Sequence, residues 1–430
     1  SLIDPIVWIC LAIFVVLILI EAPIPFAMMA SSLVYCIHQG DSFVMFASKL
    51  SASFSDYTMM AVPAFLFVGV FMNEVGLTDR LFTGVEAWIG HLTGGLAHAN
   101  VLASMIFAGM SGSALADAGG LGTIEVKTMR DAGYQDEFTV AVTAASSVIG
   151  PIIPPSINFV MWAFLSGTST MAMFMAGIVP GVLCGIMLMI WCYISIKFLG
   201  IKAPKSRKCT WKERLHATWY AMPAVLGPAV LIAGIMSGAF TPTECGVVAA
   251  AFCVAVAIGV KRFSFGMLLR ALCGSISSAA MVMALCGTGL IFNWMITTSG
   301  LVNVLSNALL SLGNVYLIVI LLNLMMLFMG CFLGASQILI LLAPLLISIA
   351  NGCGLGMVHM GVMAVFNLTI SLMTPPVAPS LFITAKAAGV PFKNCLKYGC
   401  QFLIPLAITQ LLIMFIPAVT EWLPKTLGVL

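Results

Sequence analysis

Two proline-rich segments carry the residue types with the clearest chemical potential in this chain. Both interrupt long apolar stretches, and they read Gly150-Pro-Ile-Ile-Pro-Pro-Ser156 and Thr374-Pro-Pro-Val-Ala-Pro-Ser380. Proline removes a backbone donor and clashes with the turn before it, so an unbroken helix cannot pass through either segment. At membrane depth such a break is tolerated only where it lines a cavity or binds a ligand. The carbonyl and hydroxyl oxygens released there suit hard cations, which makes both segments candidate ion sites.

Nucleophilic catalysis is a second chemistry that the sequence permits. The segment Gly109-Met-Ser-Gly112 matches a GxSG pattern, in which Ser111 would serve as the nucleophile of an intramembrane serine protease. The corresponding segment of the second half, Gly330-Cys-Phe-Leu-Gly334, has no serine between its glycines. A protease also has no need of a second broken helix. Both observations argue against proteolysis.

The composition places these segments in a membrane. The chain is 61% hydrophobic and 8% charged, with a mean hydropathy of +1.13, whereas soluble domains average about 25% charged residues. It is predicted to be an all-α polytopic protein embedded in a lipid bilayer. A net charge of +3 does not indicate nucleic-acid binding. The thirteen cysteines form no CxxC pair, so they are interpreted as small buried hydrophobic residues.

Four segments must position the candidate ion sites. Residues 95–126 form two short apolar arms around a Gly/Ser tip, which predicts a re-entrant hairpin, and the first broken helix follows at residues 138–166. The second half repeats this order, with a hairpin at 315–350 and a broken helix at 358–385. Such pairs of interrupted segments in two halves indicate the binding site of a secondary transporter.

The remaining apolar runs are predicted to be membrane spans that frame these segments. Two amphipathic stretches, 42–57 and 263–271, are expected to lie at the membrane interface beside the spans. A third amphipathic stretch, Asn73 to Trp88, reads as a surface helix. The hairpins and broken helices would then form a mobile unit inside a fixed frame.

Corresponding landmarks in the two halves are separated by 221–224 residues. The matched pairs are Gly76 with Gly300, Gly109 with Gly330, Gly150 with Thr374, and Gly167 with Gly389. We therefore divide the chain into a first repeat at 1–196, a basic cytoplasmic loop at 197–220 and a second repeat at 221–430. An odd number of crossings before each hairpin predicts that the repeats are inverted.

The distribution of basic residues predicts the orientation. Short loops rich in Lys and Arg stay in the cytoplasm, which places the segment from Lys197 to Arg214 inside. Counting spans from this loop places Lys127 and Arg130 inside and both chain termini on the periplasmic side. The expected location is the inner membrane of a bacterium or archaeon.

Four motifs together resemble one known family. They are Ala108-Gly-Met-Ser-Gly-Ser-Ala-Leu-Ala-Asp117, Gly150-Pro-Ile-Ile-Pro-Pro-Ser156, Thr241-Pro-Thr-Glu244 and Thr374-Pro-Pro-Val-Ala-Pro-Ser380. In this order they resemble the large membrane subunit of tripartite ATP-independent periplasmic (TRAP) transporters, across nearly the whole chain. The resemblance implies an elevator-type sodium symporter for a small organic solute, in most cases an organic acid.

The same resemblance implies two protein partners. One is a periplasmic substrate-binding protein that captures the small-molecule substrate. The other is a small four-helix membrane subunit, which we expect to be a separate chain because this sequence starts at the large subunit's first span. A stand-alone ion-coupled carboxylate transporter with similar hairpins is the alternative, and it would need no binding protein.

The resemblance also implies two or more sodium sites and no organic cofactor. The first sodium site would use residues of the first hairpin tip and first break: Ser111, Ser113, Gly150, Ile153 and Pro155. The second would use the equivalent places: Gly330, Gly334, Ser371, Thr374 and Val377. Most would bind through main-chain oxygens. The alternative interpretation is that glycine and serine simply allow a hairpin to pack tightly on a helix.

The substrate-binding candidates lie on the same segments. They are Asp117, Ser156, Asn158, Asn367 and Ser380. A carboxylate at membrane depth favours a functional role, although an interfacial capping role for Asp117 is an equal alternative. The asparagines could instead satisfy broken-helix backbone, and Glu244 is expected to be structural. No Lys or Arg lies in the tips or breaks, so an anion would depend on helix N-termini or on Arg130 or Lys127.

Overall fold

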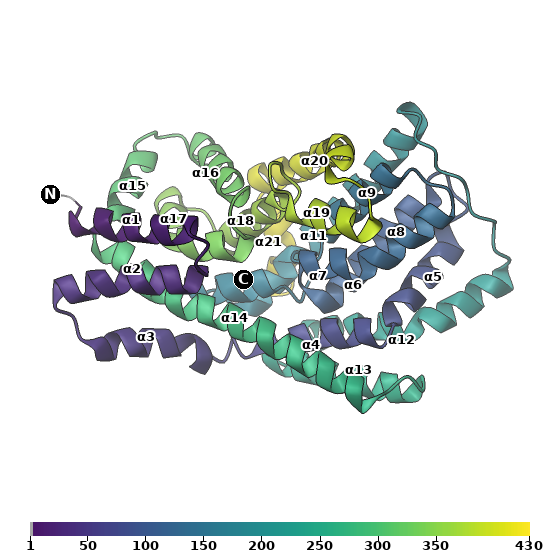
Figure 1. The fold of residues 1–430 in the computed structure, drawn as a ribbon, viewed down its shortest axis with the longest axis horizontal. Helices are drawn as coiled ribbons and strands as arrows, with labels where there is room; N and C mark the ends of the chain where they lie inside the picture. The colour runs from purple at the N-terminus through teal and green to yellow at the C-terminus, as the bar shows by residue number, and fades with distance from the viewer. Residues whose placement is uncertain (1–2) are drawn as a thin grey trace.

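The protein is built from helices. The computed structural model describes residues 3–430, and every regular element in that range is helical (Figure 1). In chain order they are α1 (Ile6–Leu19), α2 (Ile24–Gln39), α3 (Phe43–Ser55), α4 (Ala61–Glu74), α5 (Leu77–Ile89), α6 (Gly95–Ser111), α7 (Ala114–Gly119), α8 (Leu121–Asp131), α9 (Asp136–Ser147), α10 (Ile157–Ser166), α11 (Thr170–Phe198), α12 (Trp211–Met236), α13 (Pro242–Gly259), α14 (Phe265–Thr298), α15 (Leu301–Leu310), α16 (Val315–Gly330), α17 (Ala335–Cys353), α18 (Met357–Ser371), α19 (Pro379–Ala388), α20 (Phe392–Phe415) and α21 (Ala418–Thr426).

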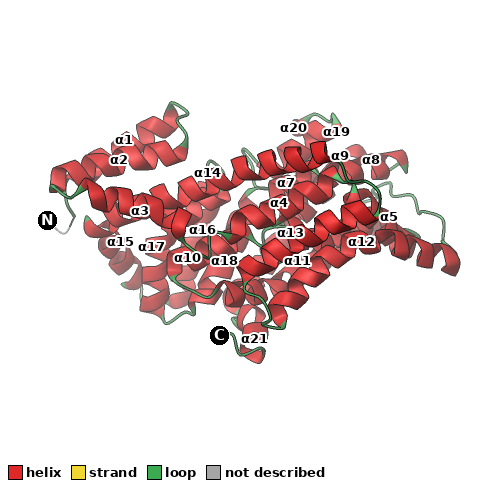
Figure 2. Cartoon of the chain, turned by 90° about the horizontal axis from the view of Figure 1, so that it is seen from below, coloured by secondary structure: helices red, strands yellow, loops and turns green. Residues whose placement is uncertain are grey.

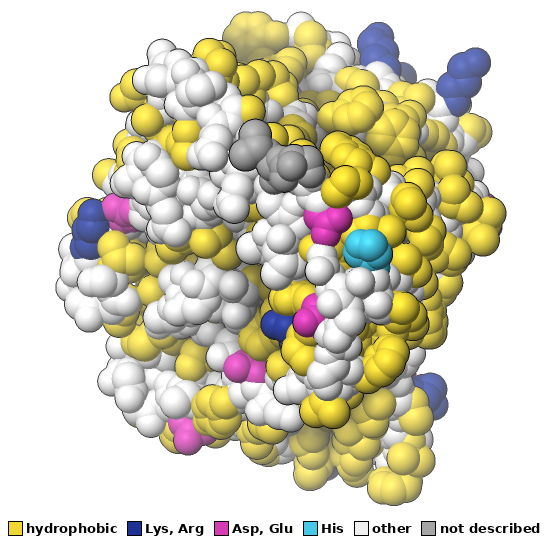
Figure 3. Space-filling view, turned by 90° about the vertical axis from the view of Figure 1, so that its left-hand side faces the viewer, with side chains coloured by type: hydrophobic (Ala, Val, Ile, Leu, Met, Phe, Trp, Pro, Cys, Tyr) yellow, Lys and Arg dark blue, Asp and Glu magenta, His cyan; other side chains and the backbone are white. Residues whose placement is uncertain are grey.

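The long apolar helices identify a multi-pass membrane protein. Within residues 3–430, six helices are long and apolar enough to cross a bilayer: α11, α12, α13, α14, α17 and α20. The pair α4 and α5 would add a seventh span, although its two helices are bent by 73°. In Figure 3 hydrophobic side chains gather on the right and lower parts of the face with few charged side chains among them, which suits contact with lipid. The all-helical, polytopic part of the predicted fold class is thus confirmed.

Polar residues start several of these helices. Thr210 and Glu213 form a capping box at the start of α12, and Thr241 and Glu244 form another at the start of α13. In the second box the Glu244 carboxylate accepts from the Thr241 amide at 2.8 Å while the Thr241 hydroxyl accepts from the Glu244 amide at 3.3 Å. These reciprocal bonds satisfy amides that the first turn leaves free. Glu244 therefore has a local structural role.

The structure corrects one expected boundary. Residues 263–271 are not a separate interfacial stretch, because α14 runs without interruption for 34 residues from Phe265 to Thr298. No proline lies in that range to stop the helix. Arg270 is accommodated because its guanidinium pairs with the Glu74 carboxylate of α4 at 3.1 Å. The long helix crosses α3, where the Ser53 hydroxyl donates to the Met283 carbonyl at 2.8 Å.

The centre of the molecule holds two non-helical segments. Residues 148–156 separate α9 from α10, and residues 372–378 separate α18 from α19. Figure 1 shows α6, α7, α18 and α19 in the interior, while Figure 2 shows α1 and α2 as a pair at one end and α14 along one side. Buried hydrophobic side chains surround both segments. The candidate residues of the first break therefore lie within the protein core, whereas the second break is partly exposed at Val377.

Candidate functional site

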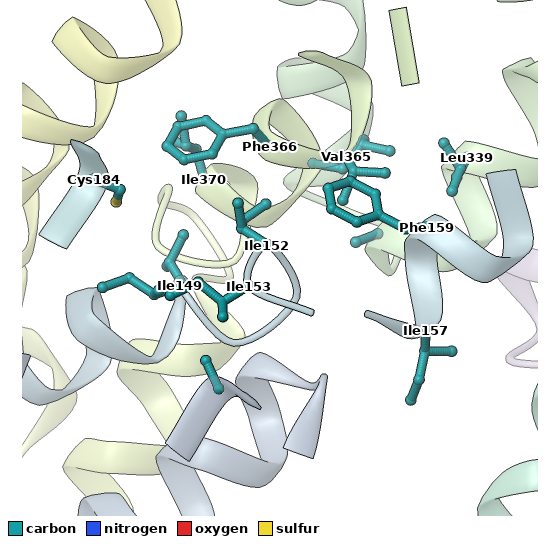
Figure 4. Packing of buried hydrophobic residues seen from close by; sticks show 14 of the residues in the cluster. Ile149, Ile152, Ile153, Ile157, Phe159, Cys184, Leu339, Val365, Phe366 and Ile370 are labelled. Carbon is teal, nitrogen blue, oxygen red and sulfur yellow. The ribbon is translucent and has the colours of Figure 1, made fainter. Parts of the chain in front are cut away.

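The first break is a buried, ordered turn. Ile149, Ile152 and Ile153 are buried around it and point into the core in Figure 4. Ser156 ends the turn: its hydroxyl donates to the Pro151 carbonyl and accepts from the Phe159 amide at 3.2 Å, which caps α10. The hydroxyl of Ser156 is thus used within the break itself, a geometry that leaves its predicted substrate contact without support.

The tip of the first hairpin lies directly on this break. α6 ends at Ser111, and the next residue, Gly112, has φ +60°. A Cβ atom at Gly112 would lie 2.4 Å from the Pro155 carbonyl oxygen. The left-handed backbone and this close approach both require glycine. Ser111 and Pro155 are therefore brought together, as the sodium-site hypothesis requires.

Asp117 completes the same cluster. Its carboxylate is fully buried, and Oδ1 accepts a hydrogen bond from the Ser111 hydroxyl. The other oxygen, Oδ2, has no hydrogen-bond partner in the described chain. A Cβ atom at Gly150 would lie 2.4 Å from that oxygen, so Oδ2 lies against the start of the break. Ser113 lies beside the cluster, where its hydroxyl accepts from the Ala116 amide at 3.5 Å and caps α7.

This cluster has the chemistry of a cation site. Buried carboxylates are costly unless a positive charge or donors compensate them, and Oδ2 of Asp117 has neither among the described residues. The serine hydroxyl, the carboxylate and the carbonyl oxygens of the break are all hard ligands. The residues present therefore fit a sodium ion. Ile153 is buried beside them and would contribute only its main chain.

The second break is assembled partly as predicted. A Cβ atom at Gly330 would lie 2.2 Å from the Ser371 hydroxyl oxygen, so the second hairpin contacts the end of α18. Ser371 and Thr374 donate to carbonyls of α18, at 2.6 Å and 3.1 Å. The Cys331 thiol donates to the Pro375 carbonyl at 3.4 Å, a contact that sequence reasoning missed.

Two predicted second-site residues lie less centrally. The amide of Gly334 donates to the Gln337 side chain at 2.8 Å, which caps its own helix α17. The Val377 side chain is 48% exposed. Glycine has no side chain and valine has no side-chain oxygen, so both residues remain candidates only through their main-chain carbonyls.

The two halves are joined by hydrogen bonds between hydroxyl and amide side chains. Ser147, the last residue of α9, lies 2.6 Å from the hydroxyl of Ser380 in α19. Asn158 of α10 accepts from Ser336 of α17 at 2.7 Å. Asn367 is buried in α18, and its Oδ1 has no partner in the described chain. Of the five substrate candidates, Asn367 and Asp117 keep a free acceptor.

A buried polar network behind the first break was missed by sequence reasoning. Glu125 of α8 is buried, and its carboxylate accepts from Ser104 at 3.5 Å. Ser104 donates to Ser146 at 3.0 Å, and Ser146 donates to Asn100 at 2.7 Å. The only sign of this network in the sequence is Glu125 itself, which lies at the end of an apolar arm and is followed by several charged residues. The network ties α6, α8 and α9 into one unit.

We predict that Ser147 and Ser380 are energetically coupled. Ser147→Ala or Ser380→Ala alone should lower the free energy of unfolding by about 1 kcal/mol. The double variant should lower it by less than the sum of the two single losses, because both partners of the hydrogen bond are gone. Thermal unfolding of the purified protein measures this. Ser311→Ala is the matched control, since that exposed serine bonds only within its own helix end. Strictly additive losses would contradict the coupling.

Comparisons with known proteins agree on one family. The family model described as "Tripartite ATP-independent periplasmic transporter, DctM component" matches residues 11–419. The sialic acid TRAP transporter large permease protein SiaM of Vibrio cholerae is 35% identical over 407 residues, covering 94% of this chain and 95% of that protein. The C4-dicarboxylate TRAP transporter large permease protein DctM of Pseudomonas aeruginosa is 33% identical over 402 residues, covering 93% and 94%.

A solved structure supports the architecture. The YdaH transporter of Alcanivorax borkumensis superimposes with a TM-score of 0.63 over 87% of this chain and 89% of that one. At 16% identity this likeness concerns the fold alone. Because the relatives are named as transporter permeases, Ser111 is not interpreted as a protease nucleophile. The chain is a multi-pass inner-membrane protein and belongs to the family of large permease subunits of tripartite ATP-independent periplasmic transporters.

Proposed function

We propose that the protein carries a small organic acid across the inner membrane together with sodium ions, after a periplasmic substrate-binding protein has delivered the substrate. One observation carries the proposal. The buried Ser111–Asp117 pair lies against the first break, and Asp117 keeps an uncompensated carboxylate oxygen there. A monovalent cation would satisfy that oxygen and the adjacent carbonyls at once.

Two or more sodium ions are proposed, at equivalent places in the two halves. The second would lie between Gly330 and the segment from Ser371 to Thr374, where hairpin and break are in contact. Unwound backbone at a helix break supplies carbonyl oxygens that converge on one point. Two sodium sites would explain why a proline-rich break occurs in each half of the chain.

An inverted repeat and an elevator motion are also proposed. The repeat is supported by matched backbone geometry, since Gly76 and Gly300 precede α5 and α15 with φ +72° and +80°. Gly167 and Gly389 end α10 and α19 with φ +70° and +66°. The hairpins and broken helices would move as one unit against the outer spans, with both termini in the periplasm.

The organic-acid substrate is proposed from the relatives, which are named for sialic acid and for C4-dicarboxylates. Arg130 is already engaged, because its guanidinium donates to the Ala388 carbonyl at 2.6 Å and pairs with Asp136 at 2.9 Å. The substrate carboxylate would therefore depend on the N-termini of α10 and α19, on the side chain of Asn367 or on Lys127. A small four-helix subunit would complete the membrane assembly.

Sodium coupling is tested in proteoliposomes that contain the large and small subunits and the binding protein. Radiolabelled sialic acid and succinate are the probes, with sodium or potassium chloride outside. Uptake of at least one probe should require sodium, because bound sodium is expected to raise the affinity for the substrate at the neighbouring site. Equal uptake in potassium would exclude sodium coupling. Uptake that needs no binding protein would favour a stand-alone carboxylate transporter.

A further inference from the structure

The seam between α5 and α12 has a composition that transport does not explain. The two helices lie side by side in Figures 1 and 2. They approach closely at Gly84, where a Cβ atom would lie 2.4 Å from the Cβ of Ala221. Arg80 and Trp88 lie four residues to either side of Gly84, on the same face of α5. This seam therefore places one arginine and one tryptophan of α5 against α12.

Arginine and aromatic side chains pair across the seam. The Arg80 guanidinium lies 4.5 Å from the ring centroid of Tyr220, and the Arg214 guanidinium lies 5.5 Å from that of Trp88. Trp88 also donates to the Thr218 hydroxyl at 2.8 Å, which fixes its ring. Both guanidinium groups thus have one face covered by an aromatic ring.

Neither guanidinium has an anionic partner in residues 3–430. Arg80 and Arg214 are absent from every ion pair there, and the Nε atoms of both and Nη2 of Arg214 are buried without a hydrogen-bond acceptor. The other four arginines each donate to a carboxylate or to a backbone carbonyl: Arg130, Arg207, Arg262 and Arg270. Both guanidinium charges therefore lack a counter-anion within the described chain, and an acceptor from outside would meet the nitrogens that are not in this buried set.

The surroundings indicate what that acceptor is. Trp211 and Trp219 are 64% and 77% exposed at the start of α12, and Trp211 contacts Trp88 edge to face at 5.5 Å. Tryptophan gathers at the headgroup level of a bilayer. The segment from Lys197 to Tyr220 holds seven basic residues and one acidic residue, Glu213. Such basic, aromatic edges attract the anionic headgroups of the cytoplasmic leaflet.

We propose that this seam binds the phosphate of an anionic phospholipid, with Arg80 and Arg214 donating to the headgroup. Guanidinium suits phosphate because its charge and its N–H donors are held in a fixed plane, and Arg80, of which only Nε is in the buried set, can offer two parallel donors. The aromatic rings hold each guanidinium in place, and the exposed tryptophans lie where the glycerol backbone and upper acyl chains would be. This site is independent of the sodium and substrate sites.

The test compares lipid binding to the purified full-length protein. Native mass spectrometry would measure how many phosphatidylglycerol or phosphatidylcholine molecules remain bound after detergent exchange. We expect about tenfold preferential retention of phosphatidylglycerol, because both lipids carry the phosphate but only phosphatidylcholine adds a choline cation that the two guanidinium charges repel. The double variant Arg80→Gln with Arg214→Gln should lose this preference. Arg270→Gln is the control, because Arg270 pairs with Glu74 between α14 and α4, outside the seam of α5 and α12.

A lysine variant and two competitors complete the lipid-binding test. Arg80→Lys with Arg214→Lys keeps the charge and should retain only part of the preference, since lysine lacks the planar fork; it also replaces the glutamine variant if that does not fold. Inorganic phosphate at millimolar concentration and the purified small membrane subunit should both leave the lipid bound. Equal lipid preference in the wild type and in the glutamine or lysine variant would overturn the proposal. Displacement of the lipid by free phosphate or by the small subunit would overturn it as well.

Discussion

Asp117→Ala should weaken sodium binding by about 10- to 100-fold, the range for removing a residue that orients a metal ligand. The carboxylate orients the Ser111 hydroxyl and brings negative charge to a buried site beside Gly150. The measurement is the unfolding temperature over a series of sodium concentrations, with choline chloride holding ionic strength constant. Bound sodium stabilises the folded state by RT times the logarithm of one plus the sodium concentration divided by Kd, so the apparent Kd is fitted to this series and weaker binding gives a larger value.

Two variants control this experiment. Asp117→Asn keeps an acceptor for Ser111 but removes the charge, and should lie between the wild type and the alanine variant. Asp41→Ala removes an exposed carboxylate distant from the breaks in sequence and should leave the apparent sodium Kd unchanged. An Asp117→Ala protein with the wild-type apparent Kd would show that the carboxylate only caps local structure.

Gly112→Ala should abolish transport while the matched Gly167→Ala protein remains active. Both glycines have positive φ, +60° and +70°, so alanine strains both backbones by roughly 1 kcal/mol or more. Only at Gly112 would the new Cβ meet a backbone atom, the Pro155 carbonyl oxygen at 2.4 Å, whereas Gly167 has open space within 4 Å. The difference in uptake between the two variants therefore reports on the contact between the hairpin tip and the first break.

The measurement is sodium-driven uptake by reconstituted protein, with thermal unfolding as a check that both variants fold. We expect a lower unfolding temperature for Gly112→Ala than for Gly167→Ala because of the clash with Pro155, with both proteins folded at the assay temperature. Uptake by Gly112→Ala should fall by more than about 90%, because a binding geometry displaced by about 1 Å costs orders of magnitude in rate. Equal activity of the two variants would contradict a functional contact between tip and break.

Local sequence accounts for the elements that depend on local chemistry. Prolines explain why residues 148–156 and 372–378 are not helical, and the six-residue spacing within the first tip places Ser111 near Asp117. Composition alone identified a polytopic membrane protein. The boundary at 263–271 was wrong because charge at Arg270 suggested an interface, whereas a tertiary ion pair with Glu74 lets α14 continue.

The contacts between the halves could not be predicted in this way. Ser147 and Ser380 are 233 residues apart, and no local pattern reveals their hydrogen bond. Glu125 precedes several charged residues in α8, so its place in the sequence gives no sign that it is buried. Its burial depends on how α6 and α9 cover that helix, which only the folded arrangement determines. Packing of distant helices, rather than residue type, therefore decided which polar groups became buried.

Direct sodium binding tests the central claim. Radioactive sodium bound to the purified protein would be measured by scintillation proximity, against a series of unlabelled sodium and potassium concentrations. The structure leads us to expect saturable binding that potassium does not displace. Ser111→Ala and Ser371→Ala should each reduce it, and their combination should abolish it, while Ser51→Ala, an exposed serine of α3, should not. Absence of saturable binding, or wild-type binding in the combined variant, would contradict sodium sites at the two breaks.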